Sequence, residues 1–597
     1  MKTASGHYDY LGLATWSFYT PSPFPRLEQR LFPPRDARTL ESTGRARFIT
    51  LLRVGYVLAV VIPVHVVAAL CSHALVPKSR WQQKGWGRAR FPTRLPGWGV
   101  GQTVCVPIIG SLFWALVYGT PRGMGWEEER TMPAASKWLF GRGHEGWCIE
   151  AEAVVLPPLP TSTTASHAMN GHAATNGVRK RHANGNGVDQ LADATLLRTD
   201  EALSTAAPAT AYDAYKEAIP TDILTGDVAG TKVGVHPLQV AAFWQWKSVA
   251  AAVSRGKVIS VKPGNDVAGI GSGMAASPSE RMVMFFVGGG YHSGHAPQGP
   301  LSWTVCRQTS LRVLGVNFRK ATSDARAFPA ALQDALAAWV YVTKRLGFRP
   351  HNVILMGDSA GGGLAMALQL YLSARVWAKH DKPREGSLGR ARKLVLHSPM
   401  VDLTLGTQAF TANRGVDIIS PYMCSLARDN YLRHFIPLPG RPSPTAKVGE
   451  CNIQAVAERY DLDPAVAPDQ RGDEWNAELA RLGAELSGTV AELGAFHPLF
   501  SPGLDARANA YLAKVLLLLT PTPRAKDELQ VLVTAGTAEI FHDQIRQFAQ
   551  NLRDLECNAV QLSLVECIDW HHVFAFMNVP GTVKAQVDEV AKNFMLA

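Results

Sequence analysis

The chain has 597 residues, a hydrophobic share of 47% and a net charge of +11, which suit roughly two to four folded domains or one large one. Residues 1–150 carry 18 Lys and Arg against 9 Asp and Glu, so +9 of the charge lies there. This basic N-terminal quarter beside a near-neutral remainder favours contact with anionic lipid headgroups. No basic helix with interleaved aromatic residues occurs, which argues against nucleic acid. The eight cysteines form no CxxC pair and no zinc-type cluster, so we expect no metal site.

Residues 54–76 follow an N-terminal tail (1–53) and contain no Asp, Glu, Lys or Arg. At 1.5 Å per residue, this length spans the hydrocarbon core of a bilayer, about 30 Å. We predict a transmembrane helix here, and a helix buried in a protein core is the alternative. Basic residues flank both of its ends, so the sequence leaves its orientation open.

A second uncharged run, 99–119, lies within a membrane-proximal region over 77–159. It is richer in glycine and is interrupted by Pro107. A second span, an interfacial helix and a cover over an active site are all compatible with it. Residues 160–210 are rich in Ala, Thr, Asn, Gly and His, and this composition predicts a disordered insertion.

From residue 235 to 597, short apolar runs alternate with helical periods. The predicted strands are RMVMFF (281–286), LRVLGVNF (311–318), NVILM (352–356), KLVLHS (393–398), LQVLVTA (529–535) and AVQLSLVE (559–566). This alternation predicts an α/β fold with a mostly parallel central sheet covered by helices on both faces. The polar segment near 440–495 is predicted to be a helical cap insertion.

The motif NVILMGDSAGGGLAMAL joins a predicted strand to a predicted helix through the turn GDSAG, which is centred on Ser359. This is a G-x-S-x-G nucleophile elbow in its strand–turn–helix context. The flanking glycines allow a sharp turn that holds the hydroxyl clear of the backbone, at the positive end of a helix dipole. We interpret Ser359 as a nucleophile, and an ordinary helix cap is the alternative.

A nucleophilic serine needs a base to take its proton and a carboxylate to orient that base. In this type of fold the chain order is serine, acid, histidine. Glu539 follows the strand LQVLVTA, and His571 and His572 follow the next strand. Because such strand ends meet at one edge of a parallel sheet, we predict Glu539 as the acid and His572 as the base. Asp543 is the rival acid and His571 the rival base.

Three glycines follow the apolar run MVMFF in the stretch MVMFFVGGGYHSG. A flexible turn would explain them, because glycine tolerates backbone angles that other residues avoid. Attack by Ser359 would place negative charge on a carbonyl oxygen beside this strand end. We therefore predict an oxyanion hole formed by the N–H groups of Gly289, Gly290 and Ala360.

The sequence resembles the hormone-sensitive-lipase-like branch of the α/β-hydrolases, including the fungal steryl acetyl hydrolases. The matching motifs are GGGY, GVNFR…FPAALQDALAAW, GDSAGG, HSPMVDLT, AGTAEIFHD and HHVF. The resemblance implies esterase or lipase activity without a cofactor, and the triad Ser359, Glu539 and His572. It also implies a glycine motif at residues 288–290. Asp402 matches a further family position and is interpreted as structural.

Two departures from the family pattern stand out. Val287 occupies the place of the usual histidine before the glycines, which predicts lower activity without loss of the chemistry. Asn317-Phe318-Arg319 replaces the usual Asp-Tyr-Arg, which affects the expected loop conformation more than the reaction.

These patterns predict a serine carboxylesterase or lipase-like hydrolase that cleaves a lipophilic ester, such as a sterol ester or acylglycerol, through an acyl-enzyme. Ligand binding without catalysis and acyl transfer to another alcohol are the alternatives. We expect a membrane location at the endoplasmic reticulum, through a single-pass or hairpin anchor. The membrane face and the oligomeric state stay open, and no nucleic-acid partner is expected.

Overall fold

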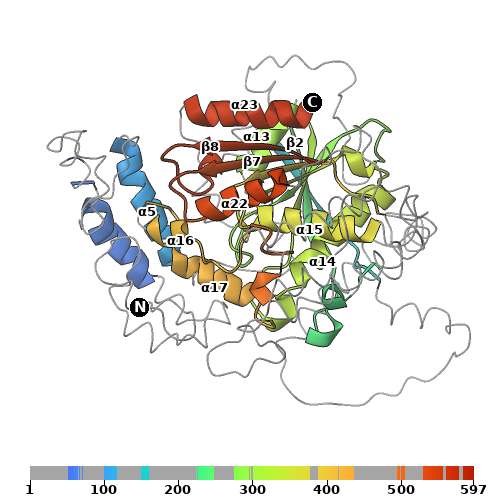
Figure 1. Cartoon of the computed structure of the whole chain (residues 1–597), viewed down its shortest axis with the longest axis horizontal. Coiled ribbons are helices and arrows are strands. Elements are labelled where there is room, and N and C mark those ends of the chain that lie inside the picture. The colour runs from blue at the N-terminus through green and yellow to red at the C-terminus, as the bar shows by residue number, and fades with distance from the viewer. Residues whose placement is uncertain are drawn as a thin grey trace, which may run out of the picture.

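Figure 1 shows the computed structural model of the whole chain. The structure describes residues 51–64, 66–67, 70, 100–116, 149–160, 223–224, 226–247, 275–294, 296, 300–376, 388–413, 416–435, 494–497, 499–503, 529–554, 560–576 and 582–597. Nearly all of the insertion predicted over 160–210 and of the cap predicted near 440–495 lies outside these residues.

The core of the fold is an eight-stranded sheet in the order β1-β2-β4-β3-β5-β6-β7-β8. The strands are β1 (Ile149–Leu156), β2 (Val240–Lys247), β3 (Met282–Phe286), β4 (Arg312–Asn317), β5 (Val353–Asp358), β6 (Lys393–His397), β7 (Leu529–Gly536) and β8 (Val560–Cys567). β2 pairs antiparallel with both β1 and β4, and every other neighbouring pair is parallel. The predicted mostly parallel sheet is therefore confirmed.

Burial explains why the central strands are continuous apolar runs. Every residue of β3 and β5 is buried, because helices cover both faces of the sheet there. At the sheet edge, β8 alternates exposed Gln561, Ser563 and Glu566 with more buried residues. The six strands predicted from sequence are β3 to β8, each within a residue or two of its predicted bounds.

Two strands were not predicted, and they lie on the opposite edge of the sheet. β1 belongs to the same sheet although it precedes residue 235, where we place the start of the catalytic domain. The sheet therefore begins upstream of that boundary. β1 and β2 are separated by residues 157–239, and such a distant pairing leaves no local signal in the sequence. The short apolar run of β2 is itself ambiguous between strand and helix.

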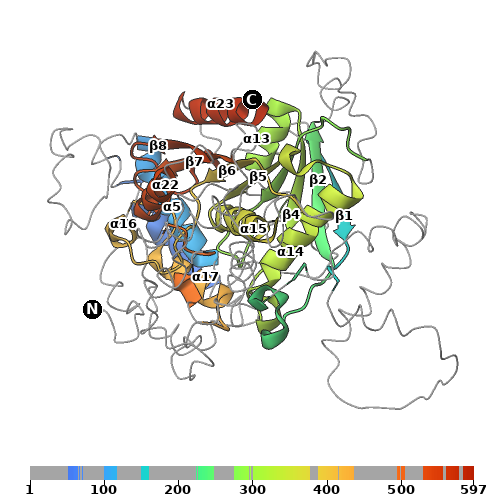
Figure 2. The ribbon, with the colours of Figure 1, turned by 45° about the vertical axis from the view of Figure 1, so that its right-hand side comes forward.

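Helices cover both faces of this sheet (Figures 1 and 2). One face carries α13 (Pro300–Thr309) and α23 (Thr582–Leu596), which lie side by side. The other carries α14 (Ala330–Val340), α15 (Ala360–Val376) and α22 (His542–Arg553). α15 is apolar nearly all round, which suits a helix packed on several sides.

Shorter helices and two N-terminal helical segments complete the described structure. α16 (Gln408–Ala412) and α17 (Pro421–Tyr431) follow β6. Short helical stretches, some of them continuing a longer helix, are η2 (Val57–Val61), η5 (Gly226–Ala229), η6 (Thr231–Val233), η8 (Asp324–Arg326), η9 (Tyr341–Arg345), η10 (Pro350–Asn352), η12 (Gly494–Phe496) and η14 (Phe574–Phe576).

The predicted span 54–76 is helical over residues 54–64, and everything from 71 onward lies outside the described residues. The second apolar run forms α5 (Val100–Leu116), which packs beside η2 through Leu112. Within the described part of the chain, no helix combines the length and the apolar character that crossing a bilayer demands. The membrane anchor stays a prediction.

Candidate active site

Ser359 lies in the tight turn between β5 and α15, as the elbow motif predicts. Its φ is 51°, a left-handed conformation that is uncommon for a residue with a side chain. Such a conformation costs on the order of 1–3 kcal/mol and persists only where its surroundings hold it. The Ser359 N–H donates to the carbonyl of His397 (2.9 Å), and the Ser359 carbonyl accepts from Met400 (2.9 Å).

The two glycines that flank the serine are required by close packing. A Cβ on Gly357 would lie 2.3 Å from the carbonyl oxygen of Gly361. A Cβ on Gly361 would lie 2.0 Å from the carbonyl oxygen of Phe286, at the end of β3. Real Cβ atoms do not approach this closely, so only glycine fits at either position.

Glu539 and His572 meet at the carboxyl ends of β7 and β8. Oε2 of Glu539 lies 2.9 Å from Nδ1 of His572, and both side chains are buried. Oε1 of Glu539 accepts a hydrogen bond of 2.7 Å from the N–H of Gly536. Because Nδ1 of His572 faces Glu539, the other ring nitrogen, Nε2, is the one available to take a proton, as a general base oriented by a carboxylate requires.

Electrostatics favour an uncharged imidazole in the resting site. Burial raises the pKa of the Glu539 carboxyl, and hydrogen bonds from Gly536 and Ser398 oppose that rise. Burial also lowers the pKa of His572, and the nearby Asp417 opposes that fall. The lowered pKa of His572 favours the free base, which is the form that can take a proton from a serine hydroxyl.

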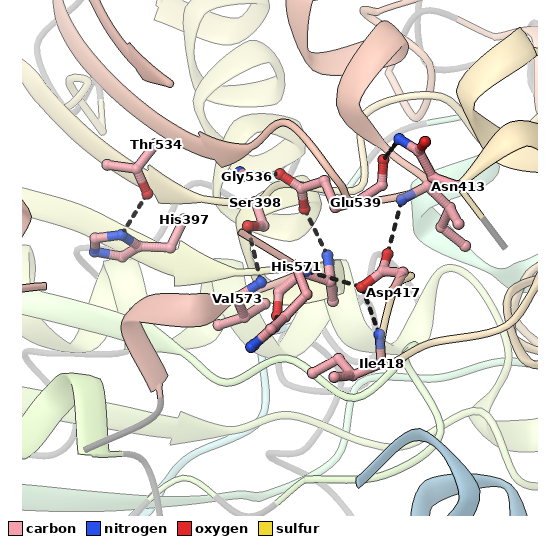
Figure 3. Close-up of polar contacts among 12 residues, drawn as sticks. His397, Ser398, Asn413, Asp417, Ile418, Thr534, Gly536, Glu539, His571 and Val573 are labelled. Atoms are coloured by element: carbon pink, nitrogen blue, oxygen red, sulfur yellow. Dashed lines mark hydrogen bonds and ion pairs between the residues drawn. The ribbon is translucent and has the colours of Figure 1, made fainter. Parts of the chain in front are cut away.

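Ser398 connects the nucleophile turn to the acid and the histidine. It directly follows His397, whose carbonyl accepts from Ser359. Its hydroxyl accepts a 2.9 Å hydrogen bond from the N–H of Val573 and also bonds to Glu539. The end of β6 therefore contacts the backbone of Ser359, the carboxyl of Glu539 and the backbone after His572; Figure 3 shows Ser398 with Val573 and Glu539.

The glycine loop after β3 lies against the nucleophile turn. The N–H of Gly288 donates to Oδ1 of Asp358, the residue before the serine (2.9 Å). Gly289 and Gly290 adopt φ values of 114° and 62°, which glycine reaches without strain. Within the described residues, the N–H groups of Gly289, Gly290 and Ala360 donate to no backbone carbonyl. The oxyanion hole formed by these three N–H groups stays a prediction.

α17 packs over this loop from the outside. A Cβ on Gly290 would lie 2.9 Å from the Cβ of Ala427. Tyr291 stacks on Tyr431 of α17, with ring centroids 3.8 Å apart and planes 7° apart. Such packing holds the loop in one conformation.

The rival acid and base are engaged elsewhere. Oδ2 of Asp543 accepts a 2.6 Å hydrogen bond from the N–H of Ala409 at the start of α16. His571 turns its Nδ1 toward the carbonyl of His572, 2.9 Å away. The structure therefore brings together Glu539 and His572 in preference to the rivals.

Other residues from the family motifs have structural contacts. Arg319 forms a buried ion pair with Asp334 of α14 (2.8 Å) and ties the end of β4 to that helix. Asp402 accepts from the N–H and hydroxyl of Thr404 and shapes the turn after β6. His292 is buried, and His295 lies outside the described residues. Among the described residues, no group of three or more His, Cys, Asp or Glu can hold a metal ion.

One buried carboxylate beside the pair was not predicted. Asp417 accepts hydrogen bonds from the N–H groups of Ile418, Ile540 and His572. Burial raises its pKa to about 7; the neighbouring His572 opposes that rise and Glu539 adds to it. A lone acid inside the apolar run Val-Asp-Ile-Ile is the signal that could have found it, because such an acid is seldom buried without partners.

A family model described as the alpha/beta hydrolase fold matches residues 283–457, which include the glycine loop and Ser359. Lipase 2 of Moraxella sp. (strain TA144) is 39% identical over 93 residues, 15% of this chain and 21% of that protein. The acetyl-hydrolase of Streptomyces hygroscopicus is 35% identical over 116 residues, 18% of this chain and 37% of that protein. This chain thus spans about a fifth to about a third of the length of these relatives.

Among solved structures, an esterase of the bacterial hormone-sensitive lipase family aligns over 60% of this chain and 80% of its own. Its TM-score of 0.35 and 19% identity are too low to add to the assignment. The strand order and the matched family model show an α/β-hydrolase fold. The resemblance to the α/β-hydrolases is confirmed by the family model and by the local matches to the curated relatives.

Proposed function

We propose that this chain is a serine hydrolase that cleaves carboxylic esters. One observation carries the proposal: a buried Glu539–His572 pair, 2.9 Å apart, is tied through Ser398 to a strained serine turn. The relatives named as a lipase and as ethyl acetate and acetyl hydrolases support it.

The residues support a two-step reaction. Ser359 attacks the ester carbonyl while Nε2 of His572 takes the hydroxyl proton, and the oxyanion receives hydrogen bonds from Gly289, Gly290 and Ala360. The tetrahedral intermediate then expels the alcohol, which takes that proton and leaves an acyl-enzyme. A water molecule, deprotonated by the same histidine, then attacks the acyl carbon. The second tetrahedral intermediate breaks its bond to Ser359, which takes the proton back from His572 as the acid is released.

A lipophilic substrate, such as a sterol ester or acylglycerol, is part of the proposal. Several large apolar side chains on the N-terminal helical segments are exposed: Leu51, Leu58, Val67, Leu70 and Val100. The surrounding N-terminal quarter is basic. Exposed apolar residues within a basic stretch of sequence favour contact with an anionic membrane surface. We propose a location at a membrane, at the endoplasmic reticulum; these exposed residues and the apolar run 54–76 support the membrane part of this proposal.

The first prediction tests the activity directly. Purified protein is expected to release p-nitrophenol from short p-nitrophenyl esters, and Ser359→Ala is expected to lower kcat by about 10⁴-fold or more. Equal release by wild type and Ser359→Ala would contradict the proposal.

A fluorophosphonate probe separates a hydrolase from a binding protein on the same fold, because only an activated serine reacts with it. Wild type is expected to be labelled at Ser359, and Ser359→Ala is expected to stay unlabelled. Product analysis with an added alcohol distinguishes hydrolysis from acyl transfer, which would use the same residues.

A further inference from the structure

The side chain of Asp417 contacts both loops that carry the acid and the base. Its Oδ1 accepts from the N–H of His572 (2.8 Å) and of Ile418 (2.7 Å). Its Oδ2 accepts from the N–H of Ile540 (2.7 Å), the residue after Glu539. One carboxylate therefore fixes the backbone beside the acid and the backbone of the base, 123 and 155 residues away in sequence (Figure 3).

A second contact from the same segment reaches the acid. Nδ2 of Asn413 donates to the carbonyls of Glu539 (2.9 Å) and Thr537 (3.2 Å). The turn after β7 is thus held from outside by Asn413 and Asp417, and its own hydrogen bond from Gly536 to Glu539 closes it from within.

The histidine loop needs such support because its backbone is strained. Val573 has a φ of 46°, which is an outlier for a β-branched residue, and Asp569 has a φ of 63°. The N–H groups of His572 and Val573 are both taken up, by Asp417 and by Ser398. These two acceptors hold the loop in a conformation that it would not adopt alone.

α5 packs against the other side of the Asp417 segment. Val106 of α5 belongs to a buried apolar cluster with Val416, Ile418 and Ala538. A Cβ on Gly110 would lie 3.2 Å from the carbonyl oxygen of Ile418, so the helix touches the backbone next to Asp417. Figures 1 and 2 both show α5 beside the segment that carries α16 and α17.

We propose that Asp417 is a positioning residue for the Glu539–His572 pair, and that α5 holds Asp417 in place through the close contact at Gly110. This inference rests on the proposed hydrolase function. Asp417 is buried behind the pair and touches no reacting atom, so it acts on the rate through geometry. The N-terminal region is then part of the catalytic framework, although the nucleophile lies about 250 residues further on.

The main experiment compares Asp417→Asn and Asp417→Ala with wild type on p-nitrophenyl esters. Asparagine keeps an oxygen for His572 and Ile418 but replaces the acceptor of Ile540 by an NH₂ group. We expect kcat to fall about 10-fold in Asp417→Asn and about 100-fold in Asp417→Ala, with KM changed less than about twofold, because misplacement alone has effects of this size. The rate of fluorophosphonate labelling is expected to fall by the same factors.

Asp402→Asn is the matched control. Asp402 is equally buried and also accepts an N–H, but from Thr404. The Asp402→Asn substitution is expected to lower Tm without a comparable loss of kcat. If Asp402→Asn and Asp417→Asn lose kcat equally at equal folded fractions, or if KM accounts for the loss, the positioning role is overturned.

Gly110→Val tests the contact with α5 and leaves the side chain of Asp417 in place, which keeps the proposal testable if the Asp417 variants fail to fold. Gly101→Val on the same helix is its control, since a Cβ at Gly101 meets no atom within 4 Å. We expect Gly110→Val to lower kcat about 10-fold at constant KM. Equal effects of the two substitutions on kcat would overturn the role of α5.

Hydrogen exchange separates failure of this inference from failure of the proposed function, because it needs no activity. Peptides covering residues 536–545 and 568–576 are expected to exchange faster in Asp417→Asn and Gly110→Val than in their controls. Unchanged exchange in both peptides would reject the positioning role, even if the wild type proves active. If the wild type proves inactive and the two variants still exchange faster than their controls, only the hydrolase function is rejected.

Discussion

The two halves of the candidate site are built in different ways. The nucleophile turn is fixed by local sequence: Gly357 and Gly361 provide the clearance that lets Ser359 reach its left-handed conformation. The acid–base half is fixed by distant residues, because Asp417 and Ser398 hold the loops of Glu539 and His572 from other parts of the chain. A motif can therefore reveal the first half, whereas only the folded structure reveals how the second is held.

The largest expected effect tests the acid–base half. His572→Ala should lower kcat by about 10⁴- to 10⁶-fold, because the serine would lose its proton acceptor. His571→Ala is the control: this neighbour is equally buried, and its Nδ1 faces the His572 carbonyl and not the Glu539 carboxylate. We expect it to lower kcat less than about tenfold. A larger loss in His571→Ala, measured on the same ester, would reverse the assignment of the base.

A smaller effect, on stability, tests the nucleophile half. In Gly361→Ala the new Cβ would meet the carbonyl oxygen of Phe286 at 2.0 Å. The backbone must shift, so we expect a loss of about 3 kcal/mol or more in the free energy of unfolding. Gly406→Ala is the control, because its Cβ would meet only Thr404 Oγ1 at 3.5 Å. Similar denaturant midpoints for both variants would show that the turn has more room than the structure gives it.

The smallest effect concerns pH. Burial raises the pKa of Asp358 to about 7, above its value in the unfolded chain of about 4. Its contribution to stability is therefore complete below about pH 4 and is lost as the pH rises through about 7. Asp358→Asn stays neutral and keeps an oxygen for the N–H of Gly288.

The wild-type Tm should accordingly fall relative to that of Asp358→Asn between about pH 6 and pH 8.5, by roughly 2 °C or more. The raised pKa values of Asp417 and Glu539 act in both proteins and cancel in this difference. A difference in Tm that is constant over this range would contradict the raised pKa.

Much of the sheet could be predicted because buried parallel strands are continuous apolar runs. β3 and β5 are such runs, and the elbow motif lies directly after β5. Glu539 and His572 could be placed together because the ends of neighbouring parallel strands meet, and β7 pairs directly with β8. The glycine turn after β5 and the pairing of β7 with β8 are therefore both features that the sequence could predict at the site.

The contributions of β1, α5 and Asp417 could not be predicted, for one shared reason. Each depends on a partner far away in the chain: β2 for β1, Ile418 for α5, and His572 for Asp417. Periodicity gives the type of an element, but it does not say which surface the element will meet. The sequence left three alternatives open for the run 99–119. In the structure this run forms α5, which packs against the backbone of Ile418, next to Asp417.

The position of β1 bears on how this protein can be divided. It forms eight register pairs with β2 from Ile149–Lys247 to Leu156–Val240, so it shields one whole side of that strand. A fragment beginning at residue 235 would expose the N–H and C=O groups of β2 to other molecules, and open strand edges recruit further strands into aggregates. A soluble fragment therefore has to include β1 (Ile149–Leu156), or receive that strand as a separate peptide.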